Sequence, residues 1–189
     1  MVIECQSQNL VLYENFVCDF HPQHEKIMSI IKSGEIGKPF IFQSFFGFPP
    51  FNKNNHKYKK NLGASSLSDI GAYPLFMARK IFCQEPLSVT CNLFYDRKSG
   101  VDIQGNYMLE FENKKSALCA FSYDSAYQNN YSVWGSKALL KVGVAYSIAA
   151  QTEPRVELIT VVNYQESRKK IKISPANQFE LIFHDFCDT

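Results

Sequence analysis

The chain has 189 residues, enough for one domain of ordinary size, or for one domain with a stub of another. Apolar residues make up 46% and charged residues 20%, a balance typical of soluble globular proteins and not of disordered chains. The formal net charge of +2 comes from scattered residues and gives no reason to expect a nucleic-acid partner. The densest basic run, 168–172, is interpreted as the solvent-facing side of a strand.

The six cysteines include no C-x-x-C pair, and several lie within apolar runs. A zinc site or a disulfide framework is therefore not expected, and buried free thiols in a reducing cytosol fit better. The sequence shows neither a signal-peptide pattern nor an apolar stretch close to the roughly 20 residues of a membrane span. These features predict a cytoplasmic protein with no membrane partner.

The first elements in chain order are a helix end and then a short apolar run at 10–13, which predicts a buried strand. Pro22 suits the first turn of a helix, because the N–H that proline lacks would be unpaired there. Apolar residues then recur at helical spacing until Gly34, which ends the helix. A strand is predicted over 39–48, and Pro49-Pro50 ends it.

Residues 51–66 are polar or small, which predicts a long loop of the kind that lines a site. Helical periodicity returns over 67–82, and from 87 onward the period changes to two. Short turns between these strands, such as 113–115, predict an antiparallel meander, and a last helix covers 179–186. The fold class is therefore α+β, with helices on one face of a mostly antiparallel sheet.

Asp69 and Tyr73 are the sharpest candidates for chemistry, because residues four apart share one face of a helix. A tyrosine hydroxyl can pass a proton to a carbonyl oxygen, and a nearby carboxylate can orient the substrate or tune that proton. A structural alternative stands beside this one. Aspartate near a helix start is favoured by the helix dipole, and a tyrosine one turn later can simply pack.

Other polar groups give weaker signals. His21 and His24 have i, i+3 spacing, but no third ligand is evident, so no metal site is predicted. Asn54, Asn55 and Tyr58 can hydrogen-bond a polyol, or they can belong to a solvated loop. No G-x-G-x-x-G or G-x-x-x-x-G-K-[ST] pattern occurs, so the sequence offers no recognisable loop for the phosphates of a cofactor.

Seven short motifs, each weak by itself, follow one another in a fixed order. They are Glu14-Asn15-Phe16, His21-Pro22-Gln23-His24, Gly34-Glu35-Ile36-Gly37, Leu62-Gly63, Asp69-Ile70-Gly71-Ala72-Tyr73-Pro74, Gly100-Val101-Asp102 and Trp134-Gly135-Ser136. In this order the chain resembles the glucose–fructose oxidoreductase / inositol dehydrogenase (Gfo/Idh/MocA) family, from about residue 4 to the end. Within that family it looks most like the nucleotide-sugar 3-ketoreductases.

The resemblance implies an NAD- or NADP-dependent oxidoreductase acting on a sugar or nucleotide-sugar carbonyl or hydroxyl. It implies that Tyr73 is the proton donor, that Asp69 helps to hold the sugar, and that His21, Asn55 and Tyr58 lie near the substrate. It also implies a homo-oligomer formed through the sheet. In the family a Rossmann domain binds the cofactor and precedes the α+β domain.

This sequence departs from the family pattern in several places. The family's glycine-rich cofactor loop and its Glu-Lys-Pro motif are not found in this sequence. We therefore expect residues 1–18 to be a remnant of the Rossmann domain, and we expect this chain alone to bind no cofactor. Residues 19–189 would form the substrate-binding and dimerisation domain, shortened at its C-terminal end. The run after Leu62 is Gly63-Ala64-Ser65-Ser66 where the family has glycines, and Lys57 replaces an arginine. Two alternatives to an enzyme remain. The chain can be a catalytically inactive sugar-binding or oligomerisation module, or it can be a barely stable gene remnant.

Overall fold

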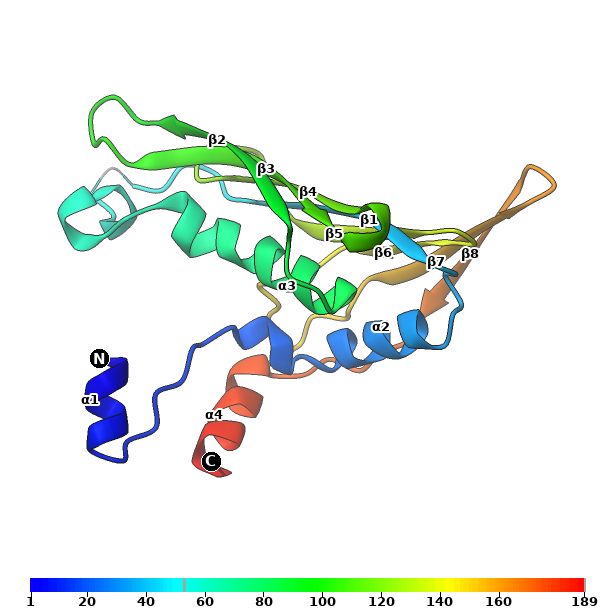
Figure 1. Cartoon of the computed structure of the whole chain (residues 1–189), viewed down its shortest axis with the longest axis horizontal. Coiled ribbons are helices and arrows are strands. Elements are labelled where there is room, and N and C mark those ends of the chain that lie inside the picture. Colours follow the sequence, from blue (N-terminus) through cyan, green and yellow to red (C-terminus); the bar gives the residue numbers. More distant parts are fainter. Residues whose placement is uncertain (53, 189) are drawn as a thin grey trace.

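The computed structural model of the chain describes residues 1–52 and 54–188 (Figure 1). Its centre is one eight-stranded sheet with the strand order β2-β3-β4-β1-β5-β6-β7-β8. The helices lie on one face of this sheet, and the other face is open. The α+β class predicted from the sequence is confirmed. The strands are β1 (Pro39–Gly47), β2 (Ser88–Tyr95), β3 (Asp102–Phe111), β4 (Lys115–Ser122), β5 (Gln128–Gly135), β6 (Leu139–Val142), β7 (Val156–Val162) and β8 (Gln165–Ile171).

In the described residues, four α-helices accompany the sheet, together with short 3₁₀-helical turns and one π-helical turn. The α-helices are α1 (Val2–Ser7), α2 (Pro22–Lys32), α3 (Ala72–Phe82) and α4 (Gln178–Asp188). The short turns are η1 (Val17–Phe20), η2 (His56–Tyr58), η3 (Lys60–Leu62), η4 (Leu67–Gly71) and η5 (Glu112–Lys114). As predicted, α2 begins at Pro22, and the backbone turns left-handed at Gly34 just beyond its end.

The order of the strands corrects the predicted meander at one place. Consecutive strands pair antiparallel from β2 to β4 and from β5 to β8, but β4 and β5 are not neighbours. Instead β1 lies between them, parallel to β4 and antiparallel to β5, so that Phe42 pairs with Ala117 on one side and Val133 on the other. A period of two tells which side chains face the core, but it does not tell which strand lies alongside.

The core lies between the sheet and the helices α2 and α3. Alternate residues of the central strands are buried on this side, such as Tyr107, Leu109 and Phe111 of β3. The helices contribute apolar side chains from one stripe each, including Ile27, Ile30, Met77, Ala78 and Ile81. Burial of such side chains is worth about 1.5–3 kcal/mol each, and this fixes α3 on the sheet.

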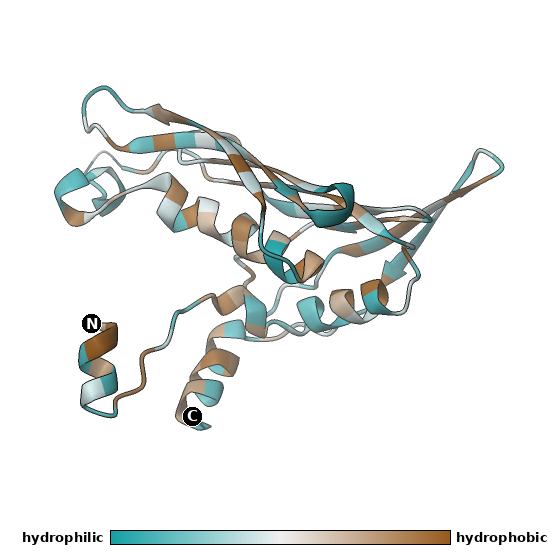
Figure 2. Cartoon of the chain, in the orientation of Figure 1, coloured by the Kyte–Doolittle hydropathy of each residue, from teal (hydrophilic) through white to brown (hydrophobic). Residues whose placement is uncertain are grey.

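The predicted buried strand at 10–13 is wrong. Leu10, Val11 and Leu12 are 63%, 48% and 48% exposed and form no strand, because no strand of the described chain lies beside them to accept their hydrogen bonds. Tyr13 instead donates a hydrogen bond to Asp185 of α4 and packs its ring edge-on against Phe186, with centroids 5.8 Å apart. Figure 2 shows apolar residues on both α1 and α4.

The residues just after this segment belong to the core of the α+β domain. Val17 and Cys18 of η1 are 6% and 0% exposed, and Phe16 stacks on Phe76 of α3 at 4.5 Å. All six cysteines are free, as expected, but only Cys18 and Cys119 are buried. Within the described residues, no helix is long and apolar enough to cross a membrane.

Candidate functional site

The helix predicted over 67–82 consists of two different elements. A π-helical turn, η4, runs from Leu67 to Gly71 and carries Asp69, and the α-helix α3 then carries Tyr73. Such wide turns are rare and occur frequently at functional sites. Gly71 is buried against β4, where an added Cβ would lie 3.0 Å from Cδ1 of Phe121. Glycine at this position therefore lets η4 approach the sheet closely.

The start of η4 is fixed by Asp102 of β3. Its Oδ2 accepts hydrogen bonds from the Ser65 hydroxyl at 3.1 Å, the Ser66 hydroxyl at 3.0 Å and the Leu67 N–H at 2.8 Å. The carboxylate thus satisfies donors that the beginning of a helix leaves free. Two of the small residues that we expected to line the site, Ser65 and Ser66, are held toward β3 in this way.

Asp69 and Tyr73 line the same hollow, as the sequence predicted. Its volume is about 280 Å³, and it lies under the end of β1. Other lining side chains are Phe46, Phe51, Lys57, Tyr146 and Gln178. The hollow is thus largely aromatic, with one carboxylate, one ammonium group and two tyrosines at its wall. The Tyr146 hydroxyl is paired with the Ser44 hydroxyl at 2.6 Å.

The Asp69 carboxylate has two partners in this wall. Its Oδ2 forms an ion pair with Lys57 Nζ and accepts a hydrogen bond from the Tyr123 hydroxyl at 2.5 Å. Lys57 Nζ also lies 5.5 Å from the centre of the Phe51 ring and 5.2 Å from that of Tyr123, within the range of cation–π attraction. These two partners hold Oδ2 in place and so fix the direction in which the second oxygen points.

Tyr73 lies in an aromatic cage. Its ring centroid is 5.5 Å from that of Phe16, 5.6 Å from Phe46 and 5.9 Å from Tyr146. Burial raises the pKa of Tyr73 above its usual value, and the nearby Asp69 carboxylate raises it further. No group in the described chain hydrogen-bonds to its hydroxyl, so this proton is available to a ligand in the hollow.

The two histidines of the weak i, i+3 pair are both buried. His21 is 1% exposed, its Nδ1 accepts the Gln23 N–H at 3.2 Å, and it does not line the hollow of Asp69 and Tyr73. Burial lowers the pKa of His21. His24 lies between the Tyr131 hydroxyl at 3.0 Å and the Ala145 carbonyl at 2.9 Å, and burial lowers its pKa to about 3. Among the described residues, no group of three potential metal ligands occurs.

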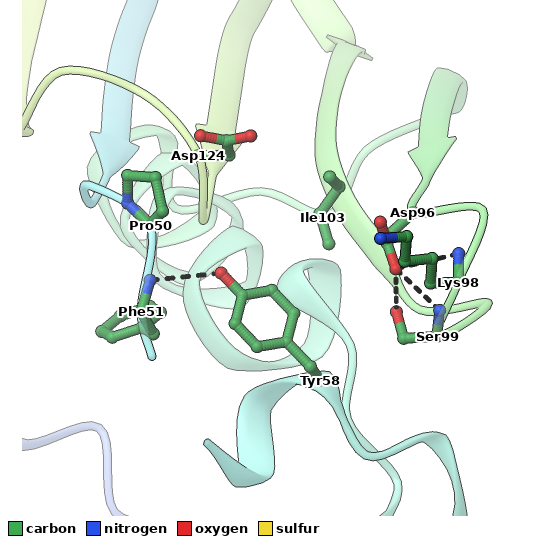
Figure 3. A pocket seen from close by; sticks show the side chains of 8 residues that line it. All are labelled: Pro50, Phe51, Tyr58, Asp96, Lys98, Ser99, Ile103 and Asp124. Carbon is green, nitrogen blue, oxygen red and sulfur yellow. Dashed lines mark hydrogen bonds between the residues drawn. The ribbon is translucent and has the colours of Figure 1, made fainter. Parts of the chain in front are cut away.

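The other two predicted substrate ligands lie in the loop between β1 and η4. Asn55 caps η2, and its Oδ1 accepts the Lys57 N–H at 3.0 Å, so that it positions the backbone of Lys57. Tyr58 lies in a second, larger hollow next to the first, where its hydroxyl accepts the Phe51 N–H at 3.2 Å (Figure 3). Neither Asn55 nor Tyr58 lines the hollow of Asp69 and Tyr73.

Three residues of the site carried no assigned role at the level of sequence. Lys57 was noticed only as a replacement for arginine, and Asp102 only as part of a motif. Tyr123 follows β4, 54 residues after Asp69, and no local spacing connects the two. Hydrogen bonds across such separations depend on how the strands are ordered.

Comparison with known proteins decides which family this arrangement belongs to. A family model described as the GFO/IDH/MocA C-terminal domain matches residues 24–141. The chain belongs to the GFO/IDH/MocA family. The resemblance noted in the sequence is thereby confirmed, and the matched residues include η4, α3 and the strands β1 to β5.

Curated relatives include several enzymes named dTDP-3,4-didehydro-2,6-dideoxy-alpha-D-glucose 3-reductase. The one from Saccharopolyspora spinosa is 32% identical over 152 residues, which is 80% of this chain and 46% of that protein. The one from Streptomyces antibioticus is 27% identical over 98% of this chain and 56% of its own length. This chain therefore spans about half the length of the curated relatives it matches.

A solved structure shares the fold over almost the whole chain. The 3-ketoreductase KijD10 from Actinomadura kijaniata, determined in complex with NADP and TDP-benzene, superposes with a TM-score of 0.88 at 26% sequence identity. The match covers 97% of this chain and 55% of KijD10. An aldose-aldose oxidoreductase from Caulobacter crescentus, 22% identical, has the same fold with a TM-score of 0.80.

Proposed function

We propose that the chain is the substrate-binding part of an NADP-dependent reductase that acts on the keto group of a nucleotide-linked sugar. The proposal rests on one observation: Asp69, Lys57 and Tyr73 line the same aromatic hollow, and Asp69 is paired with Lys57. Relatives named as dTDP-sugar 3-reductases, and a 3-ketoreductase bound to NADP, support the reaction class.

In this proposal Tyr73 gives its proton to the carbonyl oxygen of the sugar. A tyrosine hydroxyl is protonated at neutral pH, and its lack of a partner in the described chain leaves the Tyr73 proton for the substrate. Asp69, held by Lys57 and Tyr123, has a second oxygen that can accept a hydrogen bond from a sugar hydroxyl. The aromatic wall provides flat surfaces against which a sugar ring can pack.

The described residues do not fit the cofactor itself. A nicotinamide dinucleotide is usually held by a glycine-rich turn between a parallel strand and the N-terminus of a helix. The one parallel strand pair in the described chain, β1 with β4, is not joined by such a turn. We therefore propose that the hydride donor is held by residues outside this chain, and we derive no step through it.

The first test is the Tyr73→Phe substitution in a protein that joins this chain to a dinucleotide-binding domain. With NADPH and a dTDP-linked 3-keto sugar, we expect kcat to fall by at least about 100-fold, while KM changes little. General acid catalysis contributes about 10²–10⁴ in rate, and the ring that packs in the cage is retained.

Tyr127→Phe is the matched control, because Tyr127 is 51% exposed and lies outside the hollow. It should leave both constants unchanged. Unchanged turnover in Tyr73→Phe would remove Tyr73 from the reaction, and with it the proposed chemistry of this hollow.

A further inference from the structure

Four buried side-chain atoms lack a hydrogen-bond partner among the described residues. They are His21 Nε2, Gln23 Oε1, Gln84 Oε1 and Gln178 Oε1. Such atoms are rare in folded proteins, and a missing ligand is one reason for them. Of these four residues only Gln178 lines the hollow of Asp69 and Tyr73. The partner that its oxygen lacks can therefore be a ligand bound in that hollow.

Gln178 is held in place as the first residue of α4. The Asn177 side chain caps this helix, because its Oδ1 accepts the Phe179 N–H at 3.2 Å and the Glu180 N–H at 3.4 Å. One turn further along, Ile182 is 4% exposed and packs α4 into the domain. The backbone of Gln178 is thus fixed, and the residue itself is only 1% exposed.

The orientation of the Gln178 amide follows from its neighbour. Its Nε2 donates a hydrogen bond to the Tyr146 carbonyl at 3.3 Å. A carbonyl can only accept, so the amide nitrogen must face it and the amide oxygen must face elsewhere. Tyr146 is itself held at both ends, since its N–H donates to Asn129 Oδ1 at 2.7 Å and its hydroxyl pairs with that of Ser44. Gln178 therefore presents one fixed acceptor that has no donor in the described chain.

Two other polar residues of the same hollow, Asn15 and Ser147, are not held in this way. Both are exposed, and no hydrogen bond within the described chain fixes either side chain. Exposed groups exchange hydrogen bonds with water, whereas a buried acceptor without a donor destabilises the empty site. A ligand that carries a donor removes this cost. Gln178 therefore favours ligands with a donor that reaches Oε1.

Together the three held groups of the hollow offer one donor and two acceptors. Tyr73 has a hydroxyl proton, and Asp69 has a second oxygen beside the one that binds Lys57 and Tyr123. Gln178 Oε1 is the other acceptor. A keto sugar with a free hydroxyl on each side of its carbonyl matches this set, because it has one acceptor and two donors.

We infer that Gln178 is a sugar-binding residue whose Oε1 accepts a hydrogen bond from a hydroxyl beside the keto carbon. The site therefore selects keto sugars that retain this hydroxyl over the corresponding deoxy sugars. A site built to bind a hydroxyl rejects the analogue without it, since the buried acceptor is then left unpaired. The inference rests on the proposed function, because it places the keto carbon at Tyr73.

The test is a calorimetric titration of the 189-residue chain with dTDP-6-deoxyglucose and with its 2-deoxy and 4-deoxy analogues. The C3 hydroxyl of these probes takes the place of the keto oxygen, so the hydroxyls at C2 and C4 are its neighbours. We expect each analogue to bind about tenfold or more weakly than the parent. Gln178→Met should abolish the preference against one analogue and keep the preference against the other, which belongs to Asp69.

Gln84→Met is the matched control. Gln84 also has a buried Oε1 without a partner in the described chain, but it lies outside the hollow. This change should leave all three affinities unaltered. An equal loss of affinity for all three probes in Gln178→Met would show a structural role alone and would overturn the inference. Equal affinities of the unsubstituted chain for the three probes would also overturn it, because water would then satisfy Oε1.

The side-chain amide signal of Gln178 provides a readout that does not depend on the folding of any variant. In nuclear magnetic resonance spectra of the unsubstituted chain, this signal should shift when dTDP-6-deoxyglucose is added. The analogue that lacks the bound hydroxyl should shift it less. An unchanged Gln178 signal with every probe would exclude contact with the sugar.

The outcome is separate from that of the Tyr73 test, because these titrations involve neither turnover nor a cofactor. Discrimination that depends on Gln178, together with turnover that ignores Tyr73, would leave the sugar site in place and remove the reductase chemistry. Turnover that depends on Tyr73 without such discrimination would keep the proposed function and remove the role of Gln178.

Discussion

At the scale of single residues, the site depends on side chains that hold other side chains in place. Asp102 is 7% exposed and accepts three hydrogen bonds at the start of η4, the turn that carries Asp69. Tyr123 and Lys57 then fix the Asp69 carboxylate itself. The geometry of Asp69 is thus set from β3 and from the residue after β4, as well as from its own helix.

Asp102→Ala is expected to lower the free energy of unfolding by about 1–3 kcal/mol. The substitution leaves the buried Ser66 hydroxyl, the half-buried Ser65 hydroxyl and the Leu67 N–H without their acceptor. Loss of a helix cap costs a similar amount. Urea unfolding followed by far-UV circular dichroism measures the change. Asp124→Ala is the control, because its side chain is exposed and makes no hydrogen bond in the described chain. Equal stability of the two variants would contradict the role given to Asp102.

The sequence identified Asp69 and Tyr73 because both lie within one short motif, where helical spacing brings them to one side. It did not identify Tyr123 as the partner of Asp69. That contact requires β4 to lie under η4, and the position of β4 depends on long-range pairing with β1 and β3. The i, i+3 spacing of His21 and His24 predicted no metal site, and both side chains are buried, with His24 bonded at both ring nitrogens.

At the scale of elements, local patterns predicted the helices and strands of the domain better than their arrangement. The start of α2 at Pro22, the strand β1 and the turn at 113–115 all follow from residues that lie within them. The insertion of β1 between β4 and β5 does not, because pairing of strands is decided by the whole sheet. The segment 10–13 has the apolar content of a strand, but in the described chain it has no strand to pair with.

The contact of α2 with the sheet predicts a dependence of stability on pH. Burial between Tyr131 and Ala145 lowers the pKa of His24 to about 3, whereas an exposed histidine has a pKa of about 6.5. Between these values the unfolded chain binds the proton and the folded chain does not. Stability therefore falls as the pH drops below about 6.5, by up to about 1.4 kcal/mol per pH unit for this group.

Urea unfolding at pH 6.5, 6.0, 5.5 and 5.0 tests this dependence, because carboxylates with ordinary pKa values contribute little in that range. The His24→Gln variant should lose most of the slope that His24 supplies, while His21, whose pKa is also lowered, keeps its own part. His56→Gln is the control, since His56 is exposed. Equal slopes in the two variants would show that His24 does not set the dependence.

At the scale of the whole molecule, the open face of the sheet carries apolar side chains from several neighbouring strands. Phe45 of β1, Met108 of β3, Leu118 of β4 and Trp134 of β5 are 39%, 39%, 40% and 55% exposed. Met108 and Leu118 are directly paired across β3 and β4. Helices cover only the other face (Figure 1), so these groups remain in contact with water in the single chain.

We expect this face to pair with the same face of a second chain, as the family resemblance implied. Leu118→Lys places a charge near the middle of the sheet, and it should raise the dissociation constant of the dimer by about tenfold or more, since each 1.4 kcal/mol is a factor of ten. Sedimentation velocity over a concentration series measures it. Tyr164→Lys is the control, because Tyr164 is fully exposed at the tip of the β7–β8 hairpin, 101% by the same measure. If the unsubstituted chain sediments as a monomer at every concentration, the apolar open face does not pair with itself, and its exposed side chains must be explained without a second copy.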